Sequence, residues 1–116
     1  MDPVALVRRA EASMVHTVLQ VRTSPATAAE IRRLFRAIVG PCSAQRGCLG
    51  CRMLQDQEDP EGLWLLQEWD SLDHLKRHFR SEVFRWLLAA MDLSVSAPDL
   101  RFLAVDRSWG IELVEE

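Results

Sequence analysis

The stretch CLGCRMLQDQEDPEGLWLLQEWD, residues 48–70, contains two apolar segments separated by a turn sequence. The turn, residues 58–62, reads EDPEG, and Asp-Pro followed closely by Gly favours a short chain reversal. The segments on either side, residues 48–57 and 62–70, have the length and apolar content of strands. We therefore predict an antiparallel hairpin here.

The segments that flank this hairpin complete an order of elements. Residues 15–23, VHTVLQVRT, alternate between two faces as a strand does. Residues 23–40 and 71–91 carry apolar side chains at helical spacing, and residues 99–109 form a fourth strand-like segment. The predicted order β-α-β-β-α-β is the split βαβ arrangement, an α+β ferredoxin-like fold with a four-stranded antiparallel sheet.

Local signals predict where the first helix begins and ends. Ser24 is a good N-cap, and Pro25 suits the first helical position because its missing N–H needs no partner there. The Gly-Pro pair at residues 40–41 is expected to end or kink the helix near its close. The second helix is predicted to run from residue 71 to residue 91.

The third strand carries large apolar side chains on both of its faces. Leu63 and Leu65 point to one face, and Trp64 and Leu66 point to the other. The predicted helices cover one face only, so the second face would present a broader apolar patch than a monomer usually exposes. A homodimer that packs sheet against sheet through this face would cover the patch.

Composition excludes several classes of protein. The chain has 116 residues, which predicts one domain, and its net charge of −3 is spread without a basic block. Nucleic acid and anionic membranes are therefore not expected as partners. No apolar run approaches the ~18 residues of a membrane span, and nothing resembles a signal peptide. We expect a cytoplasmic protein.

Three cysteines, Cys42, Cys48 and Cys51, make an odd number in a chain without an export signal. They are expected to be free structural thiols rather than a disulfide framework. The pair in CLGC lies in a predicted strand, where residues three apart point to opposite faces. A bulge at Gly50 would change this geometry.

Two histidines, His74 and His78, are four residues apart in the second helix, within EWDSLDHLKRH. His78 falls at the border of the arc that faces the sheet, so its ring can reach the helix–sheet interior, and we predict a role in proton transfer. His74 is predicted to be solvated. The spacing could chelate zinc, but a third ligand is missing and Lys76 and Arg77 oppose a cation, so no metal site is expected.

Two segments of the chain resemble the antibiotic biosynthesis monooxygenase (ABM) family, and their sequences are most similar to its quinol monooxygenase-like branch. These segments are RGCLGCRMLQDQEDPEGLWLLQEWDS and HLKRHFRSEVF. The resemblance implies a dimeric α/β barrel of ferredoxin-like subunits. It covers residues 14–107, which leaves residues 1–13 as an N-terminal extension and residues 108–116 as a C-terminal tail.

The resemblance also implies an activity. Family members that oxidise anthrones or quinols use neither metal nor flavin, because the electron-rich substrate reduces O₂ itself. A Trp, an Asn and a Tyr line the pocket in the anthrone-oxidising branch. The Trp matches Trp69, but the other positions fall near Leu65 and Leu75, and this chain contains no Asn and no Tyr. The residues used in the haem-degrading branch are likewise not matched here.

We therefore expect a cofactor-independent monooxygenase that acts on a small aromatic quinol, phenol or polyketide-like substrate. Two alternatives remain: a non-catalytic module that binds or senses an apolar molecule, and a cofactor-free isomerase. The predicted pocket lies between sheet and helices. Its catalytic residues would be Trp69 and His78, and its substrate-binding residues Leu19, Leu65, Leu75, Phe79 and Trp86.

Overall fold

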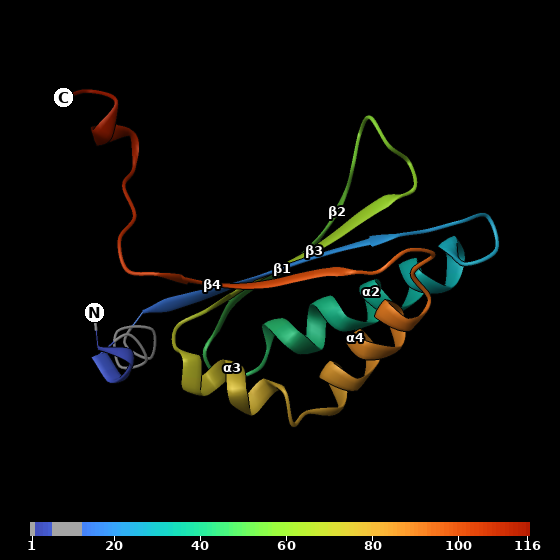
Figure 1. Cartoon of the computed structure of the whole chain (residues 1–116), viewed down its shortest axis with the longest axis horizontal. Coiled ribbons are helices and arrows are strands. Elements are labelled where there is room, and N and C mark those ends of the chain that lie inside the picture. Colours follow the sequence, from blue (N-terminus) through green and yellow to red (C-terminus); the bar gives the residue numbers. More distant parts are fainter. Residues whose placement is uncertain (1, 6–12) are drawn as a thin grey trace.

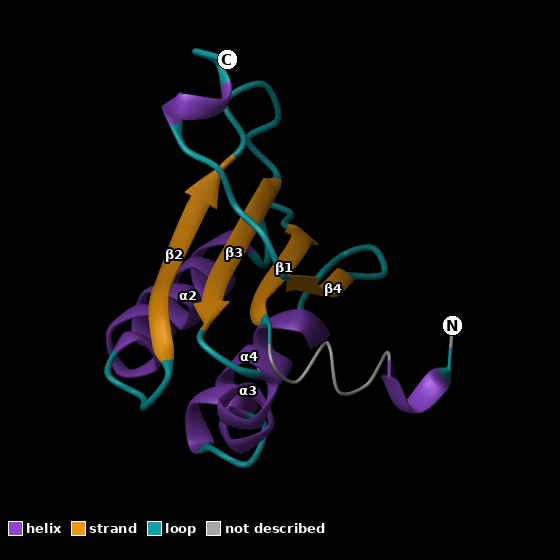
Figure 2. Ribbon diagram, turned by 90° about the vertical axis from the view of Figure 1, so that its left-hand side faces the viewer, coloured by secondary structure: helices purple, strands orange, loops and turns teal. Residues whose placement is uncertain are grey.

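The computed structural model describes residues 2–5 and 13–116. Its elements in chain order are β1 (Met14–Arg22), α2 (Ala28–Ser43), β2 (Cys48–Gln55), β3 (Gly62–Trp69), α3 (Leu72–His78), α4 (Glu82–Asp92), β4 (Asp99–Val105) and the 3-10 turn η1 (Ile111–Leu113). The strands form one antiparallel sheet in the order β2-β3-β1-β4. Helices α2, α3 and α4 lie on one face of it (Figure 1, Figure 2). The predicted α+β ferredoxin-like fold is confirmed.

The core lies between the sheet and these helices. Buried and half-buried residues alternate along β1, as its sequence predicts. Leu19, near the middle of β1, lies opposite Leu65 of β3 and Leu100 of β4. Helix α2 adds Ile31 and Phe35, which are fully buried. Each such side chain stabilises the fold by about 1.5–3 kcal/mol through removal from water.

Helix α2 begins later than the cap at Ser24 predicts. The Ser24 amide donates to Thr27 Oγ1 at 3.0 Å, so residues 24–27 form a separate turn that contains Pro25. At its other end the helix continues through Pro41 to Ser43. A proline there interrupts only the last turn, because a single N–H donor is lost.

The predicted second helix is divided into α3 and α4. Ser81 causes the break: its hydroxyl accepts from the Phe84 amide at 3.3 Å and donates to the His78 carbonyl at 2.6 Å. The hydroxyl thus caps the start of α4 at the point where a continuous helix would need that carbonyl. As a result, His78 is the last residue of α3, where the chain turns.

Gly47 joins the loop before β2 to the start of α3. Its φ of 86° lies in the left-handed region that favours glycine, and its carbonyl accepts from the Asp70 amide at 2.8 Å. A Cβ at this position would collide with the His74 imidazole, which hydrogen-bonds to Asp70 at 2.5 Å. These contacts hold the end of β3 close to the loop, and with it the residues that precede α3.

The β2–β3 ladder contains a bulge between Cys48 and Gly50. Cys48 lies opposite Trp69, and Cys51 lies opposite Gln67, both of which face the helices. The expectation that Cys48 and Cys51 point to opposite faces holds for a regular strand only. Here the alternative of a bulge next to Gly50 applies, and its extra residue reverses the alternation once.

The sheet face away from the helices, hereafter the open face, carries apolar side chains at its centre. They are Val18, Leu54, Trp64, Leu66 and Leu103. Beyond β4, residues 106–116 form an arm that extends away from the rest of the domain (Figure 1). Its Trp109, Ile111, Leu113 and Val114 are exposed.

The predicted extension at residues 1–13 lies mostly outside the described residues, and the boundary at residue 107 stays a prediction. Among the helices of residues 2–5 and 13–116, none has the length and apolar character needed to cross a membrane.

Candidate active site

Trp69 and His78 come together at the ends of their elements. Trp69 closes β3 and His78 closes α3, and their ring centroids are 4.8 Å apart. Both side chains are buried between sheet and helices. The break in the second helix and the loop held by Gly47 bring these two ends together.

A chain of hydrogen bonds fixes the orientation of the imidazole. The Trp69 indole can only donate, so Gln67 Oε1 must accept its Nε1–H, at 3.1 Å. The Gln67 amide nitrogen, 3.3 Å from His78 Nε2, is therefore the donor in that contact, and Nε2 must carry a lone pair. The proton of the ring then lies on Nδ1, which donates to Gln45 Oε1 at 2.7 Å.

The protonation state of His78 follows from its burial. Desolvation lowers the pKa of His78 from 6.5 to about 4, because the charged imidazolium would lose its hydration without gaining a carboxylate partner. The imidazole is neutral near pH 7 and presents its basic Nε2 toward Gln67. In this arrangement His78 can accept a proton at Nε2 but has no proton there to donate.

Three polar partners in this network were missed by the sequence reasoning. Gln67 bridges Trp69 and His78, and its amide nitrogen also donates to Cys42 Sγ at 3.3 Å. A signal for Gln67 existed, because it falls on the buried side of the alternation in β3. Cys42 lies in the last turn of α2 on its buried face, so helical spacing could have marked it as buried, whereas Gln45 lies in a loop that has no period.

The predicted lining residues divide into two groups. Leu19, Leu65 and Leu75 are buried in the core with Trp69 and His78. Trp86 is half-buried on α4, and Phe79, the residue after α3, is 36% exposed. The structure thus brings the first three together with the catalytic candidates and sets the other two nearer the surface. Their roles stay predictions.

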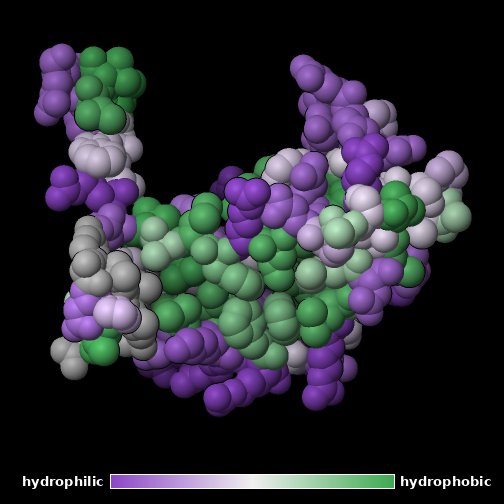
Figure 3. Space-filling model, in the orientation of Figure 1, coloured by the Kyte–Doolittle hydropathy of each residue, from purple (hydrophilic) through white to green (hydrophobic). Residues whose placement is uncertain are grey.

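Aromatic rings form a continuous line from the buried site to the surface. His78 is 5.4 Å from Phe84, Phe84 is 4.9 Å from Phe79, and Phe79 is 5.4 Å from Phe102, all between ring centroids. Phe102, on the edge strand β4, is 41% exposed. Apolar surface is visible along this edge, between β4 and the helices (Figure 3). These rings connect His78 and Trp69 with the exposed edge of the sheet.

Thr17 adds a hydroxyl on the same side of the sheet. It lies opposite Gln67 of β3 and Phe102 of β4, and its side chain is buried. Within the described part of the chain, Thr17 Oγ1 has no hydrogen-bond partner. An unpaired buried hydroxyl lowers the stability of the fold, and a hydrogen bond to a ligand hydroxyl or carbonyl could offset this loss.

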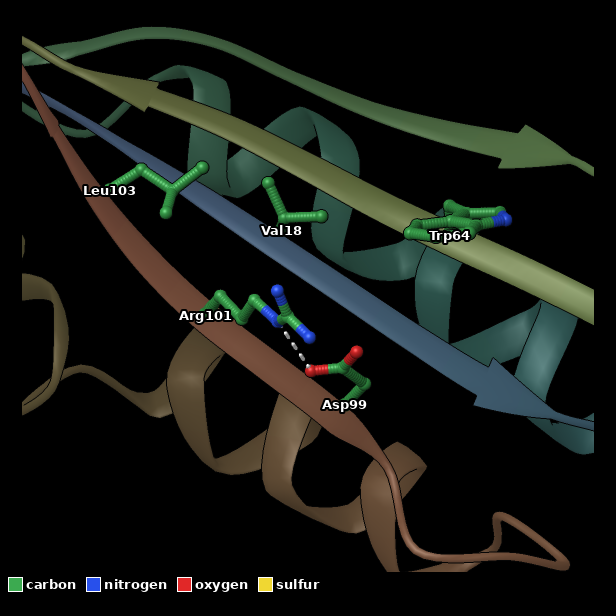
Figure 4. Close-up of a pocket in the computed structure, with 5 residues that line it drawn as sticks. All are labelled: Val18, Trp64, Asp99, Arg101 and Leu103. Carbon is green, nitrogen blue, oxygen red and sulfur yellow. Dashed lines mark hydrogen bonds and ion pairs between the residues drawn. The ribbon is translucent and has the colours of Figure 1, made fainter.

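A separate hollow of about 320 Å³ lies on the open face. Val18, Trp64, Asp99, Arg101 and Leu103 line it, and the Arg101 guanidinium bonds to Asp99 at 3.1 Å along the edge strand β4 (Figure 4). The hollow is on the opposite side of the sheet from Trp69 and His78. It is part of the surface that the sequence predicts to be covered by a second copy.

His74 and His78 do not converge. His74 bonds to Asp70, whereas His78 is directed into the core toward Gln45 and Gln67. Within residues 2–5 and 13–116, no group of three or more His, Cys, Asp or Glu side chains is arranged to hold a metal ion.

Together, these features define a class: a small ferredoxin-like α+β protein with a neutral histidine and a tryptophan in a polar network between sheet and helices. The family model of the antibiotic biosynthesis monooxygenases matches residues 14–89, well over half of the chain. The chain belongs to the antibiotic biosynthesis monooxygenase family. Among curated proteins, no sequence matches it.

Solved structures show the same fold at low sequence identity. Rv0793 of Mycobacterium tuberculosis has a TM-score of 0.76 at 19% identity, covering 84% of this chain and 100% of that chain. A Deinococcus radiodurans protein assigned by name to the same family has a TM-score of 0.75 at 21% identity, covering 84% and 97%. A conserved protein of Methanosarcina mazei has a TM-score of 0.73 at 19% identity, covering 82% and 95%.

Proposed function

We propose that this protein is a cofactor-independent monooxygenase that acts on a small aromatic quinol, phenol or polyketide-like compound. The observation that carries the proposal is the buried set of Trp69, Gln67 and neutral His78, in which a basic nitrogen is held away from water. Family membership supports the reaction class, and the apolar surroundings, including Leu19 and Leu65, support an apolar aromatic substrate.

In the proposed reaction, the substrate enters along the aromatic rings and its hydroxyl replaces the Gln67 amide at His78 Nε2. The imidazole removes the proton, because the substrate anion formed beside it supplies the charge partner that the buried ring otherwise lacks, and the electron-rich anion passes electrons to O₂. For a substrate with a CH₂ group, one oxygen atom becomes a carbonyl and the other leaves as water with the two hydrogens. Exclusion of water protects the anion and strengthens the hydrogen bonds around it.

Gln67 and Thr17 would supply polar contacts in a chain that has neither Asn nor Tyr. The Gln67 amide can donate to an oxygen atom on the substrate or to reduced oxygen. The Thr17 hydroxyl, which has no partner among the described residues, can bond to a second oxygen atom. These two groups lie opposite each other across β1 and β3, so one planar ligand could contact both.

Oxygen uptake tests the proposal. With a panel of anthrones and quinols, we expect the wild-type protein to consume O₂ and His78→Gln to lower the rate by about 10²-fold or more, the scale of general-base catalysis. His74→Gln is the matched control, because His74 is on the same short helix but bonds to Asp70 outside the site. Trp69→Phe, which keeps an aromatic ring, should also lower the rate.

The alternative is a non-catalytic binding module of the same fold. Its support is that Leu19, Leu65, Trp69 and His78 are closed off from solvent and that the hydrogen bonds of Gln67 and His78 are satisfied internally. If no member of the panel raises O₂ uptake above background while some members raise the melting temperature, the oxygenase proposal is wrong and the binding module is favoured.

We also propose that two copies pack through their open faces. The apolar side chains of that face alternate with polar ones, a mixture that protein interfaces also show. The polar side chains are His16, Gln20, Arg52, Glu68, Asp99 and Arg101. Arg22, at the end of β1, is paired within the chain to Asp59 and Glu61. The exposed apolar side chains of residues 106–116 would find contacts on the second copy.

A charge on the open face should separate the copies. Leu103, which is 47% exposed, would become a carboxylate within the apolar interface in Leu103→Glu, and we expect dissociation at concentrations where the wild type is dimeric. Leu88→Glu is the control, because Leu88 is 45% exposed on helix α4, away from the sheet. Sedimentation velocity measures the result. A wild-type monomer at micromolar concentration would contradict this assembly.

A further inference from the structure

Three thiols gather at the edge of the site, although the sequence treats them as separate structural residues. Cys42 ends helix α2, and the bulge in β2 turns both Cys48 and Cys51 toward it. Cys42 Sγ is 3.9 Å from Cys48 Sγ, and all three cysteines are free. A disulfide needs about 2.05 Å between sulfurs, so a change of side-chain torsions with a small backbone shift would join this pair.

The thiols of Cys42 and Cys48 have different environments. Cys48 is half-buried and accepts a hydrogen bond from the Cys42 thiol, which lowers the pKa of Cys48 to about 7, although burial and Glu68 act in the opposite direction. Cys42 is fully buried, and its hydrogen bonds to Cys48 and Cys51, together with burial, raise its pKa. Cys48 is therefore the thiol that ionises first and the one that a small oxidant can reach.

We propose that Cys48 and Cys42 form a peroxide-sensitive dithiol site, with Cys48 as the attacking thiol and Cys42 as the resolving thiol. The Cys48 thiolate attacks one oxygen of hydrogen peroxide and breaks the O–O bond. It becomes a sulfenic acid, and the second oxygen leaves as water after taking a proton. Cys42 Sγ then attacks the Cys48 sulfur and releases the sulfenic oxygen as a second water. Two thiols and one peroxide thus become one disulfide and two waters.

The same pair contacts the candidate active site. The Gln67 amide nitrogen donates to Cys42 Sγ at 3.3 Å while it also donates to His78 Nε2. Drawing Cys42 Sγ toward Cys48 would lengthen or break the first of these bonds and shift the Gln67 amide relative to His78. Oxidation should therefore disturb Gln67 and His78, but formation of the disulfide does not depend on the proposed oxygenase activity.

Mass spectrometry after peroxide treatment tests the proposal. Full-length protein is exposed to hydrogen peroxide, quenched, denatured, alkylated and digested. We expect a cross-linked Cys42–Cys48 peptide and an alkylated Cys51. Cys51→Ala is the matched control and should retain the cross-link, whereas Cys42→Ala should stop at a Cys48 sulfenic acid that dimedone traps.

A second measurement uses the unaltered protein, so that a folding defect in a variant cannot obscure the result. Under native conditions, iodoacetamide should label Cys48 before Cys42 and Cys51. The proposal is overturned if peroxide leaves Cys42 and Cys48 reduced, or if the cross-link joins Cys48 to Cys51. It is also overturned if Cys48 is not the first thiol labelled.

The effect on the site is read by NMR from the side-chain amide of Gln67 and the ring nitrogens of His78. Their resonances should shift in the oxidised protein and return with a reducing agent. If the cross-link forms without any shift, the link between the dithiol and the site is wrong. Absence of O₂ uptake would count against the oxygenase alone, because neither the mass nor the resonances depend on turnover.

Discussion

Trp69→Ala is expected to lower the free energy of unfolding by about 3–5 kcal/mol, the range for removal of a buried aromatic side chain. Trp69 is fully buried at the end of β3, and its ring packs on His78 at 4.8 Å. Truncation leaves a cavity under α3 and also removes the donor to Gln67 Oε1. Urea unfolding followed by circular dichroism measures the loss.

Two further variants separate the causes of this loss. Trp69→Phe keeps most of the packing but leaves Gln67 Oε1 without its donor, which should cost about 1–3 kcal/mol. Val95→Ala is the control, because that side chain is 54% exposed in the loop between α4 and β4 and should change stability by less than about 0.5 kcal/mol. A loss below about 1 kcal/mol for Trp69→Ala would contradict the packing described for this site.

Acid is expected to destabilise the protein by on the order of 3 kcal/mol through His78 alone. The pKa of His78 falls from 6.5 to about 4 on folding, because the buried imidazole resists protonation. Between these values the unfolded chain binds a proton that the folded chain does not. Stability is therefore complete above pH 6.5, falls as the pH decreases toward 4, and loses nothing more from this group at lower pH.

Urea midpoints between pH 7 and pH 4.5 measure this effect, and His78→Gln should flatten the dependence in that range. His74→Gln is the control for replacement of a histidine by glutamine in the same helix, since His74 lies outside the buried network. The pKa of the Asp59 carboxyl is lowered chiefly by its hydrogen bond to Arg22, so its contribution is lost only at more acidic pH. An unchanged slope in His78→Gln would show that another group controls the acid response.

The parts of the site differ in how far local sequence predicts them. Trp69 and the leucines around it follow from alternation in the strands, because a period of two decides which side chains meet the helices. Gln67 lies on the same buried side and could have been recognised as a polar residue that needs partners. Gln45 carries no comparable signal, since it stands in a loop with no period. Only the folded chain brings it within 2.7 Å of His78.

Other differences arise where one local interaction competes with another. The hydroxyl of Ser81 ends one helix and starts the next, a result that helical spacing of apolar residues does not reveal. One extra residue in β2 moves Cys48 to the side of Cys42 and Cys51, which a regular strand would forbid. The break at Ser81 and the bulge in β2 both depend on hydrogen bonds, and the partners in those bonds are positioned by the helices and strands on either side.

By itself, the sequence determined the order of strands and helical segments, the alternation of side chains along β1 and β3, and the family to which the chain belongs. These properties depend on periodic patterns and turns, which act over a few residues. The tertiary structure decided the neutral state of His78, the bridging role of Gln67 and the meeting of Cys42 with Cys48. Each of these depends on burial and on contacts between distant segments, because desolvation and hydrogen-bond partners exist only once the sheet and helices have packed.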